Sequence, residues 1–193
     1  MKINTDYHIP VMLQPCLDGL DLQANGTYVD VTFGGGGHAR AIFDQLSSGG
    51  QLIVFDQDPD AHNNAWEASN FHFVPANFAF LRNHLRALGS PQVDGIIADL
   101  GVSSHQFDTA QRGFSIREDA PLDMRMNRNG GQSAAELIAT ADEAKLASIL
   151  YEYGELRNSR ALAAQLVRQR ENAPILTTFG LMKALERFAP KFK

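Results

Sequence analysis

The sequence predicts an α/β protein built on a parallel sheet. Over the first hundred residues, four apolar runs rich in β-branched and aromatic side chains alternate with segments of helical periodicity. This alternation is typical of βαβ units. The run at 96–98 (IIA) is continuously apolar, as expected for a strand covered on both faces.

The individual elements of the first half follow from local patterns. Strands are expected at 27–33, 51–56, 72–75 and 93–100. Helical segments are expected between them: 38–46 has apolar side chains on one face, 59–69 opens with a proline after an aspartate, and 78–88 repeats apolar residues every three or four positions.

The second half has a different organisation, with no strand candidate after residue 100. Residues 105–132 are irregular and rich in Gly, Arg, Asp and Asn. Ser133 and Glu136 then form a capping-box pattern that opens a short helix. Longer helices are expected at 142–153, 158–171 and 177–188, so we predict two domains, 1–104 and 105–193.

Composition narrows the classes of function. The chain has 193 residues, is 44% hydrophobic and carries a net charge of −5, which argues against a generic electrostatic nucleic-acid binder. The charge is uneven: residues 1–100 hold 4 Lys and Arg against 11 Asp and Glu, and residues 101–193 hold 13 against 11. A single cysteine, Cys16, excludes a disulfide framework and a Cys-rich zinc site. With no signal peptide and no membrane-length apolar run, a cytoplasmic location is expected.

The glycine loop at 34–37 is the most informative motif, because it follows a strand and opens a helix. Asp56 ends the next strand, 20 residues after Gly36, where an acid can bind ribose hydroxyls. The pattern fits a dinucleotide or S-adenosylmethionine. Asp30, just before the loop, favours S-adenosylmethionine, because a cationic amino-acid end gains from an acid and a pyrophosphate does not.

Further candidates lie where the later strands end, the edge at which parallel sheets bind ligands. Phe78 could stack on an adenine ring or be a core residue of its helix. Asp99, at the end of the fourth strand, could accept a hydrogen bond from an amine if it is desolvated. Ser103 and Ser104 follow it, in a position suited to an acceptor substrate.

Several motifs in register resemble the bacterial 16S rRNA (cytosine-N4-)methyltransferase family, RsmH/MraW. They are residues 8–13 (HIPVML), 28–38 (YVDVTFGGGGH), 99–104 (DLGVSS), 112–115 (RGFS), 121–126 (PLDMRM) and 131–136 (GQSAAE). The resemblance implies a Rossmann-like methyltransferase domain with an inserted small helical domain for substrate recognition. It also implies S-adenosylmethionine as methyl donor and, as acceptor, a cytosine in the decoding region of the small ribosomal subunit.

The resemblance also implies roles for individual residues. The cofactor-binding set is Gly34, Gly36, Gly37, His38, Asp56, Phe78, Asp99 and Gln106. Asp99 is the candidate catalytic residue, and Ser103, Ser104, Arg112 and Arg125 are candidate substrate contacts. The arginines of 105–132 would meet rRNA phosphates, although the interleaved Glu118, Asp119 and Asp123 equally suggest internal ion pairs. No metal site is expected.

The resemblance departs at the C-terminal end, where the family has three more strands. An apolar fourth strand left at the edge of a sheet is an aggregation liability, so either the helical part covers it or further strands are missing from this chain. A C-terminally truncated member is expected. A homodimer is a separate option for its assembly. Two alternatives stay open: a Rossmann module of an NAD-dependent oxidoreductase, and an inactive fragment that acts only as a binding module.

Overall fold

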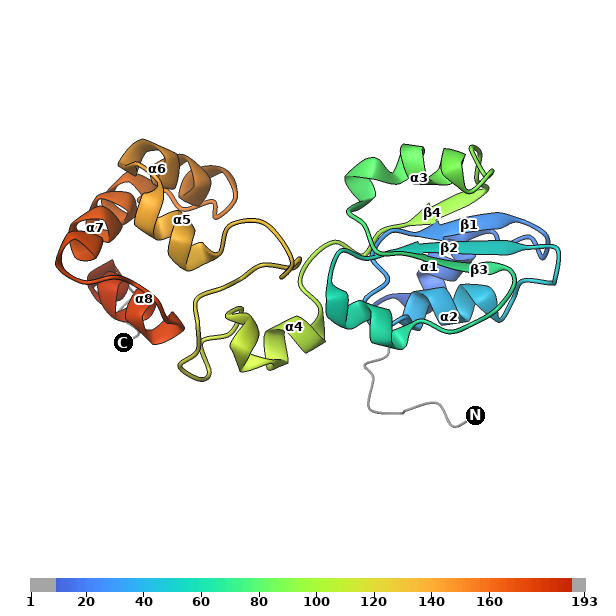
Figure 1. The fold of residues 1–193 in the computed structure, drawn as a ribbon, viewed down its shortest axis with the longest axis horizontal. Helices are drawn as coiled ribbons and strands as arrows, with labels where there is room; N and C mark the ends of the chain where they lie inside the picture. The colour runs from blue at the N-terminus through green and yellow to red at the C-terminus, as the bar shows by residue number, and fades with distance from the viewer. Residues whose placement is uncertain (1–9, 189–193) are drawn as a thin grey trace. The chain divides into compact units, whose positions relative to one another are not determined.

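The computed structural model describes residues 10–188 and divides them into two compact units (Figure 1). The first unit comprises the described residues up to Ser104 together with Met126–Asn129. The second comprises His105–Arg125 and the described residues from Gly130 onward. The motif at 8–13 lies partly outside the described residues.

A four-stranded parallel sheet forms the centre of the first unit and confirms the predicted α/β class. Its strands are β1 (Thr27–Asp30), β2 (Gln51–Phe55), β3 (Phe71–Val74) and β4 (Gly95–Ile97), in the order β3-β2-β1-β4. The order reverses beside β1, because β2 pairs with one side of it and β4 with the other. The carboxyl ends of β1 and β4 therefore flank the switch point, the usual ligand position in such sheets.

Helices cover both faces of this sheet. Helices α1 (Leu13–Leu20) and α2 (Gly37–Phe43) lie on one face and α3 (Leu81–Ala87) on the other (Figure 1). Alternate strand residues serve two cores, as the pleat requires. Tyr28, Leu52 and Val54 pack into the α1/α2 core, whereas their neighbours Val29, Ile53 and Phe55 join the core that includes Leu85 of α3.

Two predicted helices differ in the structure, and one helix was not predicted. Residues 59–69 form only a 3₁₀ helix, η1 (Pro59–Asn64), because the Asn64 amide donates to the Gly34 carbonyl and Trp66 then stacks on Phe71. The segment 78–88 begins as a 3₁₀ turn, η2 (Phe78–Phe80), before α3. Helix α1 escaped prediction because its N-cap, Met12, has a left-handed backbone and no side-chain cap.

The second unit is helical, as predicted. Short α4 (Ser104–Asp108) spans the boundary and is followed by η3 (Ala110–Arg112), α5 (Ala134–Thr140), α6 (Glu143–Glu152), α7 (Ser159–Asn172), α8 (Thr178–Leu185) and η4 (Glu186–Phe188). The Ser133–Glu136 capping box at the start of α5 is confirmed. Leu146, Leu166 and Ile175 are among the residues of a separate hydrophobic core.

Strand β4 is one of the two edge strands of the described sheet and is shorter than predicted. Ile96 is 48% exposed, whereas Ile97 is buried. Beyond the strand, Leu100 is 71% exposed. The described part of the chain thus has an apolar edge beside β4. None of its helices is long and apolar enough to cross a membrane.

Candidate active site

Two hydrogen bonds hold Gly34 of the glycine loop, one to Asp56, just after β2, and one to Asn64 of η1. The Gly34 amide donates to Asp56 Oδ2 at 2.8 Å, and the Asn64 side chain donates to the Gly34 carbonyl at 2.9 Å. The other Asp56 oxygen accepts from the Asp58 amide at 2.8 Å. Gly34 and Gly36 have positive φ values of 50° and 77°, a backbone that favours glycine. The loop is therefore preformed in the described structure.

The last position of the glycine loop is constrained by packing. A Cβ on Gly37 would collide with the ring of Pro10. Gly36 is the N-cap of α2, which has no side-chain cap. Next to it, His38 is buried, and its Nε2 has no hydrogen-bond partner among the described residues. A buried polar atom without a partner is costly, so His38 has a hydrogen-bonding site to offer a ligand.

Asp30 is a buried carboxylate at the end of β1. It is 2% exposed, and Oδ1 accepts from the Thr32 amide at 3.0 Å and from Thr32 Oγ1 at 3.4 Å. Burial raises its pKa, the hydrogen bonds from Thr32 lower it, and the charges of Asp56 and Asp99 add to the rise, so that the pKa is about 6. The environment thus disfavours another negative charge and favours a cation.

Asp56 shares this acidic environment. Burial raises its pKa, the amide hydrogen bonds from Asp58 and Gly34 oppose the shift, and the Asp58 carboxylate adds to it. One Asp56 oxygen faces the loop and the other faces the Asp58 amide. The predicted ribose contact of Asp56 would therefore use the remaining acceptor capacity of the two oxygens.

Thr32 joins β1 to the segment after β4 and was missed by sequence reasoning. Its hydroxyl accepts from the Asp99 amide at 2.7 Å and lies 3.4 Å from Asp30 Oδ1. The Asp99 side chain is exposed, so the desolvated carboxylate of this edge is Asp30 rather than Asp99. No sequence signal singled out Thr32, because a threonine after a strand is common and its two partners lie on different elements.

The end of β3 presents Phe78 in a defined position. Asn77, just before it, donates to Gln57 Oε1 at 3.0 Å and caps the Ala79 amide at 2.8 Å. Phe78 is 43% exposed, so the alternative that it is a buried core residue is wrong. Gln57 also donates weakly to Met126 Sδ, 3.9 Å away. Gln57 and Asn77 are further residues that the sequence did not single out.

The predicted site residues of the first unit lie in the segments that follow the carboxyl ends of the four strands. They are Gly34, Gly36, Gly37, His38, Asp56, Phe78, Asp99, Ser103 and Ser104. Gln106, Arg112 and Arg125 belong to the second unit. Gln106 is buried within α4.

The arginines of 105–125 are engaged within the second unit. Arg112 is 1% exposed, and its guanidinium donates to the Arg125 carbonyl at 2.9 Å. Arg125 in turn pairs with both oxygens of Asp123, at 2.7 and 2.8 Å, and this hydrogen bonding raises the Arg125 pKa above its usual value. Arg117 pairs with Asp108 at 3.1 Å. The internal-ion-pair interpretation therefore describes these contacts.

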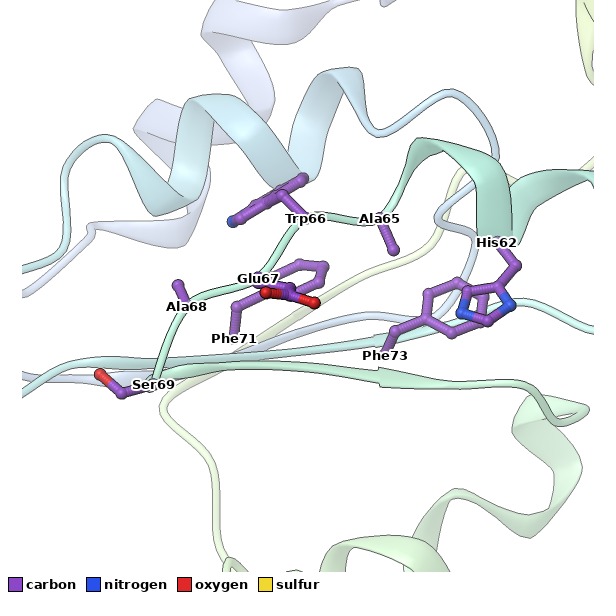
Figure 2. A pocket seen from close by; sticks show the side chains of 8 residues that line it. All are labelled: His62, Ala65, Trp66, Glu67, Ala68, Ser69, Phe71 and Phe73. Atoms are coloured by element: carbon purple, nitrogen blue, oxygen red, sulfur yellow. The ribbon is translucent and has the colours of Figure 1, made fainter.

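A separate cavity of about 630 Å³ lies beside β3 (Figure 2). Two ring stacks line it: Trp66 on Phe71, with centroids 3.9 Å apart, and His62 on Phe73, 4.9 Å apart. Glu67 also lines it. None of the predicted cofactor or substrate residues lines this cavity. Among the described residues, no group of three His, Cys, Asp or Glu side chains could hold a metal ion.

Comparisons with known proteins place these features in context. The MraW methylase family matches residues 5–193. The ribosomal RNA small subunit methyltransferase H of Cytophaga hutchinsonii is 51% identical over 189 residues, covering 97% of this chain and 63% of its own length. That of Bacteroides thetaiotaomicron is 52% identical over 191 residues, covering 99% of this chain and 62% of its own length.

The match to a third relative covers a smaller part of both chains. The protein of the same description from Porphyromonas gingivalis is 54% identical over 167 residues, which is 86% of this chain and 54% of the relative. The chain thus spans less than two thirds of the length of the curated relatives it matches.

Proposed function

This chain belongs to the MraW methylase family, and on that premise we propose that it forms the S-adenosylmethionine-binding part of an rRNA methyltransferase. The reaction would transfer a methyl group to N4 of a cytosine in the decoding region of 16S rRNA. The relatives' description as small-subunit rRNA methyltransferases supports this proposal. A cytoplasmic location and the small ribosomal subunit as partner follow from it.

The observation that carries the proposal is the buried Asp30 carboxylate beside the glycine loop. S-adenosylmethionine supplies a methylsulfonium centre and ends in an ammonium group, so it brings positive charge. Burial, with the nearby charges of Asp56 and Asp99, raises the pKa of Asp30. This acidic edge stabilises a cation and repels a pyrophosphate. The same electrostatics disfavour the NAD-module alternative.

The remaining predicted contacts have complementary chemistry. Asp56 has acceptor oxygens for ribose hydroxyls. The exposed ring of Phe78 offers a surface for an adenine base. His38 Nε2 is a buried polar atom without a hydrogen-bond partner among the described residues, and it can bond to a ligand. Each of these roles is a proposal for this chain.

Asp99 is the proposed group on the acceptor side. The cytosine amine is a poor nucleophile, because its lone pair conjugates with the ring. An acceptor at that amine makes the lone pair more available, and Asp99, exposed and fixed through its amide to Thr32, can provide it. Most of the remaining rate enhancement would come from holding amine and methyl within about 3.5 Å. The base must leave its stack to reach such a site.

Calorimetric titration with S-adenosylmethionine and with NAD tests the cofactor assignment. We expect binding of S-adenosylmethionine alone, weakened by Asp56→Ala and retained in Asp44→Ala, an aspartate at the end of α2 away from the loop. Binding of NAD alone would instead establish the oxidoreductase module. If the chain binds neither compound, the fragment without cofactor becomes the better description.

The methyl acceptor requires a separate measurement. Mass spectrometry of small-subunit rRNA from cells with and without the gene should show one cytosine lighter by a methyl group when the gene is absent. An unchanged cytosine mass would exclude the proposed substrate.

A further inference from the structure

The turn between α6 and α7 carries exposed aromatic rings and exposed arginines within ten residues. Tyr151 is 63% exposed and Tyr153 is 83% exposed, the highest value among the exposed large hydrophobic side chains of the described residues. Arg157 and Arg160 are also exposed. We call Tyr151, Tyr153, Arg157 and Arg160 the turn patch.

The backbone holds the turn patch in a fixed conformation. The Glu155 amide donates to the Tyr151 carbonyl at 3.1 Å, and the Leu156 amide donates to the Leu150 carbonyl at 3.1 Å. The Ser159 amide then donates to the Leu156 carbonyl at 3.0 Å. A Cβ on Gly154 would lie 2.8 Å from the Leu150 carbonyl oxygen, so the close turn depends on this glycine. Tyrosine rings on such a turn are presented at little entropic cost.

The arginines of the turn patch differ from those of 105–125. Arg112, Arg117 and Arg125 are committed to partners within their own unit. The side chains of Arg157 and Arg160 have no hydrogen bond or ion pair among the described residues. Their charge is therefore available to an external anion.

The charge of the C-terminal segment supports the same conclusion. Residues 145–193 contain nine Lys and Arg against four Asp and Glu, whereas residues 101–144 contain four against seven. The positive charge of the second half is thus concentrated from α6 onward. Glu152 and Glu155 are interleaved in the turn, and Glu152 accepts from Ser148 at 3.3 Å.

We infer that the turn patch is a contact surface for single-stranded RNA, with bases stacking on Tyr151 and Tyr153 and phosphates meeting Arg157 and Arg160. Aromatic platforms followed by arginines suit unpaired strands, because every base has a face that stacks and every nucleotide has a phosphate. This inference rests on the proposed function, since it names the surface through which the helical unit would meet the rRNA.

The test is fluorescence anisotropy with a labelled single-stranded oligocytidylate of about 12 nucleotides, titrated with the 193-residue chain over a range of salt concentrations. Tyr153→Leu should weaken binding about tenfold, and Tyr153→Phe, which keeps the ring, should restore most of it. Arg157→Gln should weaken binding and lower the slope of log K against log salt by about 0.7.

Arg168→Gln is the matched control. Arg168 lies on the same helix as Arg160, is exposed and contacts Gln165, and lies about 12 Å further along α7 at 1.5 Å per residue. Its removal should leave affinity near that of the unaltered chain. Equal weakening by Arg168→Gln and Arg157→Gln would overturn the local patch in favour of diffuse attraction.

Other outcomes also decide against the patch. The inference fails if the unaltered chain binds no oligocytidylate, if Tyr153→Leu binds as well as the unaltered chain, or if a duplex RNA competes equally. If Tyr153→Leu binds as well as the unaltered chain, a protein partner would explain the exposed rings better. If duplex RNA competes equally, contacts to the RNA phosphate backbone alone would explain the binding. Calorimetry with S-adenosylmethionine on the same samples separates this failure from failure of the proposed function, since the cofactor residues lie in the first unit.

Discussion

Asp30 is the residue at which stability and proposed function oppose one another. A buried carboxylate with two carboxylate neighbours costs free energy in the ligand-free chain. The two hydrogen bonds from Thr32 compensate for it only in part, because the pKa of Asp30 still rises to about 6. A cation bound beside Asp30 would offset the rest of this free-energy cost.

Asp30→Asn should therefore stabilise the ligand-free chain and weaken binding of S-adenosylmethionine. A folded-state pKa of about 6 against an ordinary 3.8 means that the folded chain holds the proton more tightly, so stability falls as pH rises from 3.8 to 6. Above pH 6 the cost is complete, about 3 kcal/mol. Urea unfolding at pH 8 should show a gain of about 1–3 kcal/mol in Asp30→Asn.

The pH dependence of that gain provides the control. The gain should shrink as the pH is lowered from 6 towards 4 and vanish well below 3.8, where Asp30 is protonated in both the folded and the unfolded chain. A gain that is equal at pH 4 and pH 8, or a loss at pH 8, would contradict the electrostatic explanation.

Arg112 is a buried cation that stabilises the fold of the second unit. Its guanidinium supports the Arg125 carbonyl, and its own carbonyl accepts from the Met124 amide at 3.0 Å. Arg112→Gln should lower the free energy of unfolding by more than about 2 kcal/mol, because a buried charge-assisted network is lost. Urea or thermal unfolding measures the effect.

Arg128→Gln serves as the matched arginine replacement. Arg128 is exposed, and its removal should change stability by no more than about 0.5 kcal/mol. If both variants unfold at the same urea concentration, Arg112 has no structural role.

At the scale of elements, α2 and α5 begin in opposite ways. Helix α5 starts with a complete capping box, in which Ser133 Oγ accepts from the Glu136 amide at 3.2 Å and Glu136 accepts from the Ser133 amide at 2.8 Å. Helix α2 starts at Gly36, without a side-chain cap. Side chains of α5 itself therefore satisfy amides at its N-terminus, whereas no side chain caps the N-terminus of α2, the helix beside the glycine loop.

Ser133→Ala should destabilise the second unit by about 1 kcal/mol, and Ser133→Thr should restore most of the loss. The hydrogen bonds from Ser133 also lower the pKa of Glu136. The stabilisation from the charged Glu136 is therefore present at pH 7 and is lost as the pH falls through that lowered pKa.

Far-ultraviolet circular dichroism during thermal unfolding provides the measurement. Ser148→Ala, in the middle of α6, is the control for loss of a hydroxyl away from a helix start. A Ser133→Ala variant as stable as the unaltered chain would show that the capping box contributes nothing.

The elements that sequence patterns predicted are those with a strong local signal. The four strands were apparent because buried parallel strands are continuous apolar runs, and α5 was apparent from its capping box. The prediction of a helix at 59–69 was wrong, because contacts of Asn64 and Trp66 with residues distant in sequence determine the backbone conformation there. Local periodicity carries no information on such contacts.

The candidate site was predictable to a similar extent. The glycine loop and Asp56 follow from spacing, and the structure joins them through the Gly34 amide. Thr32 and Gln57 were missed because their importance lies in partners 67 and 69 positions away, Asp99 and Met126. The assignment of 105–193 as an inserted domain and the binding roles of the site residues stay predictions.

The molecule as a whole consists of two units with separate hydrophobic cores. Trp66 is the single tryptophan of the chain and lies in the first unit, packed against Phe71 and Phe33. Most α-helical residues lie in the second unit. Two spectroscopic signals therefore report on different parts of the chain.

Urea unfolding followed by tryptophan fluorescence and by circular dichroism at the helical band should give transitions that do not coincide. Separate cores have no reason to share one cooperative transition. S-adenosylmethionine should shift the fluorescence transition to higher urea and shift the helical transition much less, because ligand stabilises the unit that binds it. Superimposable transitions, with and without ligand, would show one cooperative body.

The buried Asp30 carboxylate has a thermochemical consequence at the binding step itself. Near pH 6 the ligand-free chain holds a proton there about half of the time. A cation bound beside Asp30 lowers that pKa and releases the proton to the solvent. The apparent enthalpy of binding should then depend on the ionisation enthalpy of the buffer at pH 6 and become independent of it at pH 8. Loss of this buffer dependence in Asp30→Asn would identify Asp30, rather than Asp56, as the carboxylate that the ligand meets.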